Sequence, residues 1–288
     1  MTSNSKNSLQ KEWLLVIAKA IIFAACAGGL TTLTHMICDR YVLHTHGAPD
    51  FLSQNLILFS AFDKILVAVG YYIFGRKIPV KNPILRSLAY IALNWISNFF
   101  PQFMGLAFAD GSIAEQAFRI SDLVCDSITH IIAGILLGIL FYKVPDATLR
   151  KCNKQVYIKT IAVSAIAFPV IITATTQLIG ILYPPFSCLS ILEVSEQVKL
   201  PFYLNFYSWF ILSGAFIAVF YRVTEYNTGE AWLSFGLKYS LLLWTPVVMI
   251  MFVFGTAFIP TVAYSLLFIA ILLLLARIIG SMMSKGNR

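Results

Sequence analysis

The chain alternates long runs of apolar residues with short polar segments. A transmembrane helix needs about 20 predominantly apolar residues to cross a bilayer core of about 30 Å. Eight runs in the sequence are close to this length or exceed it. The pattern therefore predicts eight transmembrane helices, over about 13–37, 51–75, 84–109, 122–144, 160–183, 203–221, 239–258 and 261–280.

Polar segments at both ends of the chain complete the predicted organisation. Residues 1–12 are expected to form a disordered cytoplasmic tail, residues 13–280 a single transmembrane domain, and residues 281–288 a second cytoplasmic tail. The segment 225–238 mixes aromatic and polar residues and fits either a short interfacial helix or an ordinary loop. The predicted fold class is all-α, a polytopic transmembrane helix bundle.

The composition supports a membrane protein. Hydrophobic residues make up 59% of the chain, charged residues only 12%, and the mean hydropathy is +0.80. Soluble domains contain about 25% charged residues, so this chain has too few polar side chains to cover a soluble fold of its length. The lipid bilayer is therefore its expected surrounding.

Lysine and arginine residues are concentrated in alternate connecting segments, and only Arg40, Arg119 and Lys199 fall in the other set. An excess of Lys and Arg marks the cytoplasmic side of a membrane protein. Both termini are therefore predicted to be cytoplasmic, and we expect the bacterial cytoplasmic (inner) membrane. The same distribution accounts for the net charge of +8 without nucleic-acid binding.

Charged residues inside the predicted spans are the strongest indication of function. A charge at the bilayer centre costs about 2.5–3.5 kcal/mol on insertion scales. Asp63 and Lys64 lie near the middle of the second span, about 18 Å from each end. Because adjacent helical positions point about 100° apart, each is expected to need a partner on another helix or a water-filled cavity. Lys19 and Arg277 lie nearer the inner ends of their spans and are expected to extend to the interface.

Other polar side chains recur four residues apart on three further spans. The fourth span carries two carboxylates and a histidine, the third carries amides, and the fifth carries threonine and glutamine in its outer half. Polar residues at such positions either bind neighbouring helices or line a pathway. We interpret them as a solute or ion pathway open to the outside, formed by Asp63, Lys64, Asn94, Asn98, Gln102, Asp122, Asp126, His130, Thr173 and Gln177.

A metal site is the alternative use of the outer polar residues. Imidazole and carboxylate groups together suit zinc, manganese or iron, although no established metal-binding spacing is present. No other cofactor is indicated. A divalent metal would be bound by His35, Asp39, His44 and His46. Asp126 and His130 are further candidate donors.

Three of the five cysteines, Cys38, Cys125 and Cys188, fall near the predicted outer face. An oxidising compartment permits a disulfide there. We expect all three to be unpaired, with one disulfide as the alternative.

The motifs of several enzyme classes are missing from the sequence. It contains neither the GxSxG of hydrolases nor a Walker phosphate-binding loop, so a non-enzymatic role is favoured. The leading hypothesis is a secondary carrier or exporter for a small polar or ionic solute, with proton or cation coupling. The alternatives are a non-catalytic subunit of a membrane complex and a membrane-embedded metalloenzyme that uses the outer His/Asp cluster.

Overall fold

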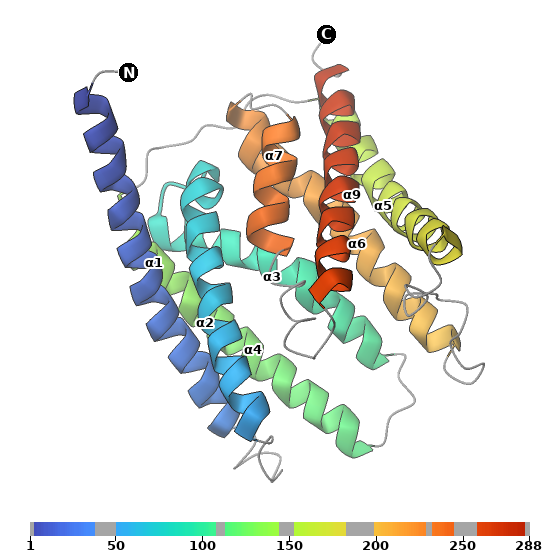
Figure 1. The fold of residues 1–288 in the computed structure, drawn as a ribbon, viewed down its shortest axis with the longest axis horizontal. Coiled ribbons are helices and arrows are strands. Elements are labelled where there is room, and N and C mark those ends of the chain that lie inside the picture. The colour runs from blue at the N-terminus through green and yellow to red at the C-terminus, as the bar shows by residue number, and fades with distance from the viewer. Residues whose placement is uncertain are drawn as a thin grey trace. The chain divides into compact units, whose positions relative to one another are not determined.

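The computed structural model describes residues 3–37, 50–107, 113–143, 153–182, 199–228, 232–244 and 258–285. Within these ranges the chain is helical and forms no β-strand, which confirms the all-α prediction (Figure 1). The elements are α1 (Ser3–Ile37), α2 (Asp50–Ile73), the 3₁₀ turn η2 (Gly75–Lys77), α3 (Pro83–Ala107), α4 (Ile113–Leu140), α5 (Lys154–Leu182), α6 (Lys199–Thr228), α7 (Trp232–Tyr239), the π-helical turn η5 (Ser240–Trp244) and α9 (Phe258–Lys285).

The helices belong to two compact units. The helices α1 and α2 lie in the first, the helices α5, α6, α7 and α9 lie in the second, and α3 and α4 contribute to both. The first unit comprises Met1–Ala92, Ile120–Thr148 and Leu242–Gly255, and the second comprises Leu93–Arg119, Leu149–Leu241 and Thr256–Arg288.

Among the described residues, three helices are long and apolar enough to cross a membrane. They contain the segments Gln10–Thr34, Lys154–Thr175 and Leu266–Ser284, which correspond to the first, fifth and eighth predicted spans. Segments of α4 and α6 form shorter apolar helices. Length and composition thus support an integral membrane protein.

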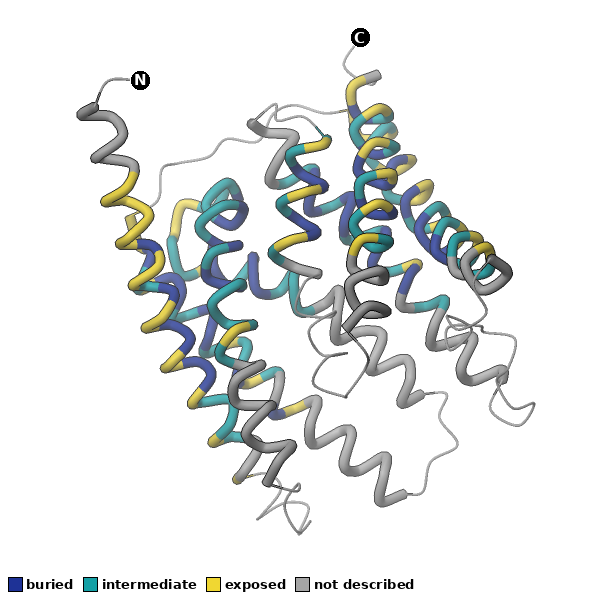
Figure 2. Tube along the Cα trace, viewed as in Figure 1, coloured by how far each residue is buried: buried dark blue, intermediate teal, exposed yellow. Residues whose placement is uncertain are grey.

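The surface of α1 shows why a bilayer suits this chain. Large apolar side chains are exposed along one face, among them Leu14 (60%) and Leu15 (57%), while Ala20 and Phe23 on the opposite face are fully buried. Exposed and buried stretches alternate along the helix (Figure 2). A continuous apolar face of this kind is costly in water and favourable against lipid tails.

Some boundaries differ from the sequence-based expectation. The helix α1 begins at Ser3, so it includes most of the segment 1–12 that was expected to be disordered. The helix α7 covers part of the 225–238 segment, which resolves the choice between helix and loop for those residues. Its extension by a π-helical turn takes up the start of the seventh predicted span; residues 245–257 of that span lie outside the described residues.

Glycines on α4 bring α3 and α4 together in the first unit. A Cβ at Gly134 would lie 2.7 Å from Leu88 Cδ2, and one at Gly138 would lie 2.7 Å from Ser87 Oγ. The Ser87 hydroxyl donates to the Gly134 carbonyl at 2.6 Å. The spacing Gly134–x₃–Gly138 is the small-residue pattern that lets membrane helices approach closely.

The second unit uses a similar glycine contact, with aromatic rings packed beside it. Gly214 on α6 lies directly against the backbone carbonyl of Ser164 on α5. The Phe168 and Phe210 rings meet edge to face beside it, with centroids 5.5 Å apart. Glycine is needed at this contact because a side chain would push the two helices apart.

Candidate functional site

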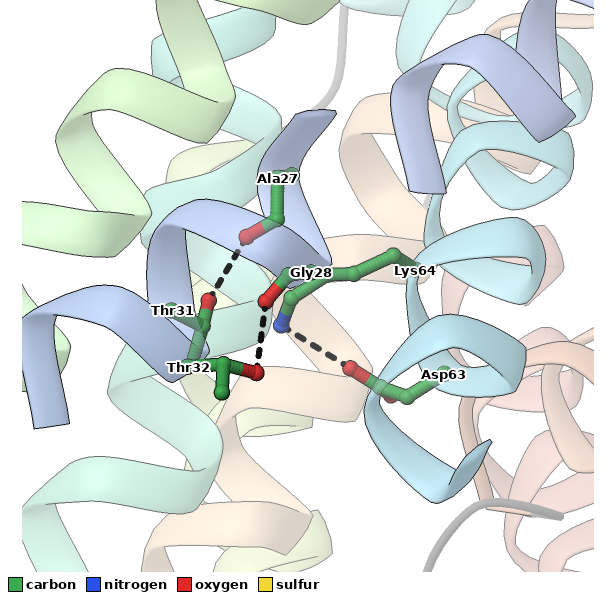
Figure 3. A network of polar contacts seen from close by, with 6 residues as sticks. All are labelled: Ala27, Gly28, Thr31, Thr32, Asp63 and Lys64. Atoms are coloured by element: carbon green, nitrogen blue, oxygen red, sulfur yellow. Dashed lines mark hydrogen bonds and ion pairs between the residues drawn. The ribbon is translucent and has the colours of Figure 1, made fainter. Parts of the chain in front are cut away.

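The charged pair that the sequence places at mid-span lies on α2, which packs along α1. Asp63 is ten residues before the end of α2 at Ile73, or about 15 Å along the axis. The pair is therefore well inside the apolar part of the helix. Its neighbours come from the α1 turn that contains Gly28 and Thr32 (Figure 3).

Asp63 and Lys64 form an ion pair with one another. Lys64 Nζ donates to Asp63 Oδ2 at 3.0 Å. A partner on a different helix, the first of the two expected arrangements, is therefore not required for either charge, and the second, a water-filled cavity, stays a prediction. Adjacent Cβ atoms do point apart, but the four-carbon stem of lysine is long and flexible enough to turn its ammonium back to the neighbouring carboxylate.

Hydroxyl and carbonyl oxygens of α1 lie on the side toward which Lys64 extends (Figure 3). The Thr31 hydroxyl donates to the Ala27 carbonyl at 2.9 Å, and the Thr32 hydroxyl donates to the Gly28 carbonyl at 3.0 Å. A hydroxyl that donates to its own helix keeps lone pairs that can accept further hydrogen bonds. This turn of α1 therefore presents acceptors to a cationic or hydrogen-bonding group.

The ion pair has unused bonding capacity among the described residues. An ammonium has three donors and a carboxylate has about four acceptor positions, and the Lys64–Asp63 bond uses one of each. The Lys64 side chain is 13% exposed and the Asp63 side chain 25% exposed. Both charged groups are thus shielded but accessible, as a binding group requires.

The remaining predicted pathway residues are only partly described. His130 is half-buried in the first unit, and Asn94, Thr173 and Gln177 are half-buried in the second. The pathway assignment of these residues is untested and stays a prediction. The side chains of Asn98, Gln102, Asp122, Asp126 and His35 lie outside the described residues, as do Asp39, His44 and His46.

Most of the residues in the metal hypothesis lie outside the described part of the chain. Within that part, no group of three or more His, Cys, Asp or Glu residues is arranged to hold a metal ion. The cluster of His35, Asp39, His44 and His46 therefore stays a prediction.

Lys19 has a specific partner that the sequence did not indicate. Its ammonium donates to the Leu140 carbonyl at 2.6 Å and lies 5.3 Å from the centre of the Phe141 ring. Leu140 is the last residue of α4, where carbonyls lack helical partners and the helix dipole favours a cation. Lys19 therefore joins the middle of α1 to the end of α4.

An exposed polar cluster joins α1 to the end of α2. The Tyr72 hydroxyl donates to the Glu12 carboxylate, and Arg76 Nη1 lies 4.0 Å from Glu12 Oε1. The Arg76 guanidinium is 4.2 Å from the centre of the Tyr72 ring, and the Trp13 ring meets that ring edge to face at 5.4 Å. Aromatic and basic residues in this arrangement are typical of a membrane–water interface.

Arg86 is a buried charge in the first turn of α3. It is 2% exposed, and its Nε donates to the Val80 carbonyl at 2.5 Å. Nearby Tyr71 is fully buried, and its hydroxyl has no hydrogen-bond partner within the described ranges. Asn82 and Pro83 mark a helix start in the sequence. An arginine just inside a helix start is electrostatically unfavourable without a partner, so the sequence does indicate that Arg86 needs one.

One cysteine differs from the expectation of unpaired thiols. Cys125 on α4 is disulfide-bonded, whereas Cys26 on α1 is free and exposed. The other three cysteines, Cys38, Cys152 and Cys188, lie outside the described residues. The expectation of an unpaired thiol is therefore wrong for Cys125, and the alternative, one disulfide among Cys38, Cys125 and Cys188, stays a prediction as to the partner.

Comparison with known proteins adds no functional assignment. No protein family matches the chain, and no curated protein and no solved structure shows significant similarity to it. The function must therefore be argued from the site itself.

Proposed function

We propose that this protein is a multi-pass membrane transporter, a secondary carrier or exporter for a small polar or ionic solute that is coupled to a proton or cation. The observation that supports this proposal is the Asp63–Lys64 ion pair inside α2. It is half-shielded, faces oxygen atoms of α1 and has unused donors and acceptors. The absence of a Walker loop from the sequence favours an ion gradient over ATP as the energy source.

The pair offers a physical route to coupling. In the apolar surroundings of a membrane helix, a carboxylate and an ammonium stabilise one another's charge. A proton or cation that binds Asp63 removes the partner of Lys64, and the free ammonium then favours an anionic or hydrogen-bonding group. Occupancy of one group thus changes the affinity of the other, which is the reciprocal relation that coupling requires.

The test is charge displacement by the purified protein in proteoliposomes on a solid-supported membrane. Solutes are applied one at a time across a panel of organic anions, cations and zwitterions, with and without a pH step. We expect at least one solute to give a current or a pH-dependent response in the wild type. Asp63→Asn and Lys64→Gln should each abolish it.

Arg76→Gln is the matched control, because Arg76 lies just beyond the same helix and its ion pair with Glu12 is exposed. It should retain the response of the wild type. A silent wild type across the whole panel, or full responses in both Asp63→Asn and Lys64→Gln, contradicts the proposal. Co-purification of other membrane proteins with a silent wild type would instead support the non-catalytic subunit.

The proposal includes eight spans with both termini in the cytoplasm of a bacterial inner membrane. The distribution of Lys and Arg along the sequence supports this arrangement. The proposed arrangement puts Cys125 on the same outer side as Cys38 and Cys188, and Cys152 on the opposite side. Peptide mapping without reduction should therefore find Cys125 joined to Cys38 or Cys188; a bond to Cys152 contradicts the orientation.

A further inference from the structure

We infer that the Asp63–Lys64 pair binds a small zwitterion, of the α-amino acid type, by opening to receive it. This inference rests on the proposed function and names the substrate class of the same site. In the bound state the solute ammonium would pair with Asp63, and the solute carboxylate would pair with Lys64. No covalent bond changes, and the total charge of the site stays at zero.

Charge balance distinguishes a zwitterion from a simple ion. The closed pair is already neutral, with Nζ and Oδ2 3.0 Å apart. A lone anion that binds Lys64 leaves the carboxylate of Asp63 unpaired, and a lone cation that binds Asp63 leaves the ammonium unpaired. An unpaired charge inside a membrane helix is costly. Only a ligand that carries both charges replaces both halves of the pair.

The bonding capacity of the site matches such a ligand. The ammonium of Lys64 has two donors beyond the bond to Asp63, and the carboxylate has about three further acceptor positions. An amino acid brings the complementary set, three donors on its ammonium and two oxygen atoms on its carboxylate. The Thr31 and Thr32 oxygens on the facing turn of α1 add acceptors for the solute ammonium.

The local packing leaves room on α1. Gly29 is exposed, and a Cβ built on it would meet no atom within 4 Å, whereas a Cβ at Gly75, Gly134 or Gly138 of the same unit would meet Tyr71 or residues of α3. Small residues at 27–29 keep this part of α1 free of bulky side chains. Residues 27–29 of α1 thus present no bulky side chain to a solute.

The experiment measures the midpoint of thermal unfolding in mild detergent with added probes. The probes are the amino acids that occur in proteins, each applied alone, and an equimolar mixture of acetate and methylammonium at the same concentration. That mixture supplies both charges on separate molecules. A ligand that binds only the folded protein raises its midpoint, so at least one amino acid should raise it by several degrees.

The control is Asp63→Asn combined with Lys64→Gln, which removes both charges and leaves neither unpaired. It should fold like the wild type and lose the response to amino acids. A shift with acetate or methylammonium as large as any amino acid shift overturns the inference, as does a shift that persists in the double variant. If no amino acid gives a shift but a simple ion still gives pair-dependent currents, the zwitterion inference fails and the transport proposal stands.

Discussion

In the first unit, charged side chains lie inside the apolar helices, and three of them, Lys19, Lys64 and Arg86, donate to oxygen atoms of the same unit. In the second unit, the buried polar side chains of the described residues are hydroxyls. Ser164 and Ser240, for example, each donate to a carbonyl four residues earlier in their own helix, at 2.7 and 2.6 Å. The second unit also carries charged side chains, but those of Arg222 and Lys238 are half-buried and that of Arg277 is exposed. Among the fully buried polar side chains of the described residues, a charge therefore occurs in the first unit alone, at Arg86.

This difference helps to separate structure from function. The second unit shows that helices of this chain can pack through glycine contacts and aromatic rings such as Phe168–Phe210, so packing alone does not require charge. In the first unit, Lys19 and Arg86 donate to backbone carbonyls and have a structural role. The Asp63–Lys64 pair contains no such backbone bond among the described contacts, and it is therefore the best candidate for chemistry.

The largest effect is expected from Gly214→Val in the second unit. The new side chain would meet the Ser164 carbonyl and Phe168 Cβ, the latter 2.9 Å from the added Cβ. Overpacking against backbone should lower the free energy of unfolding by about 3 kcal/mol. Thermal unfolding in detergent measures the loss.

Gly29→Val is the matched control and should change the free energy of unfolding by less than about 0.5 kcal/mol, because its Cβ meets no atom within 4 Å. Equal losses in the two variants would show that close packing is not the reason.

An intermediate effect is expected from Lys64→Gln in the first unit. It leaves the Asp63 carboxylate unpaired and should cost about 2 kcal/mol, less than the 3–5 kcal/mol of a fully buried pair because Asp63 is 25% exposed. Adding Asp63→Asn should restore most of this loss, which a double-mutant cycle of unfolding free energies detects. Additive losses would show that the two side chains do not interact.

The smallest effect is expected from Lys19→Met. It removes a cation from the end of α4 but keeps an apolar side chain of similar length, so stability should fall by about 1 kcal/mol. Transport should be retained, since Lys19 is bound to the Leu140 carbonyl. A variant that keeps its thermal midpoint but loses transport would move Lys19 from the structural to the functional group.

Much of the fold follows from the apolar runs, because a long run without polar interruption has few alternatives to a helix in lipid. The eighth predicted span begins at about 261, whereas α9 begins at Phe258. Pro260 lies between these points, and proline is tolerated in the first turn of a helix. The Gly134–x₃–Gly138 spacing was visible in the sequence, but the partner helix was not, because a small-residue pattern does not specify what packs against it.

The sequence marks Asp63 and Lys64 as candidates by their position along the span, but it does not contain the geometry of the pair. Asp63 and Lys64 stood out because charge is rare and costly at mid-span. Their mutual bond depends on the rotamers of a flexible lysine, which helical periodicity does not determine. The partner of Lys19 lies 121 positions away in the chain, and the partner of Arg86 depends on the backbone conformation just before α3. A single sequence specifies neither.

The bond between Lys19 and Leu140 has a consequence for biosynthesis. Its two residues are 121 positions apart, and a ribosome that adds about 5–20 residues per second needs roughly 6–24 s to make the intervening chain. During that interval α1 has left the ribosome while the carbonyl that binds its lysine does not yet exist. The ammonium must then reach toward the lipid headgroups, and α1 becomes fixed in depth only when the end of α4 arrives.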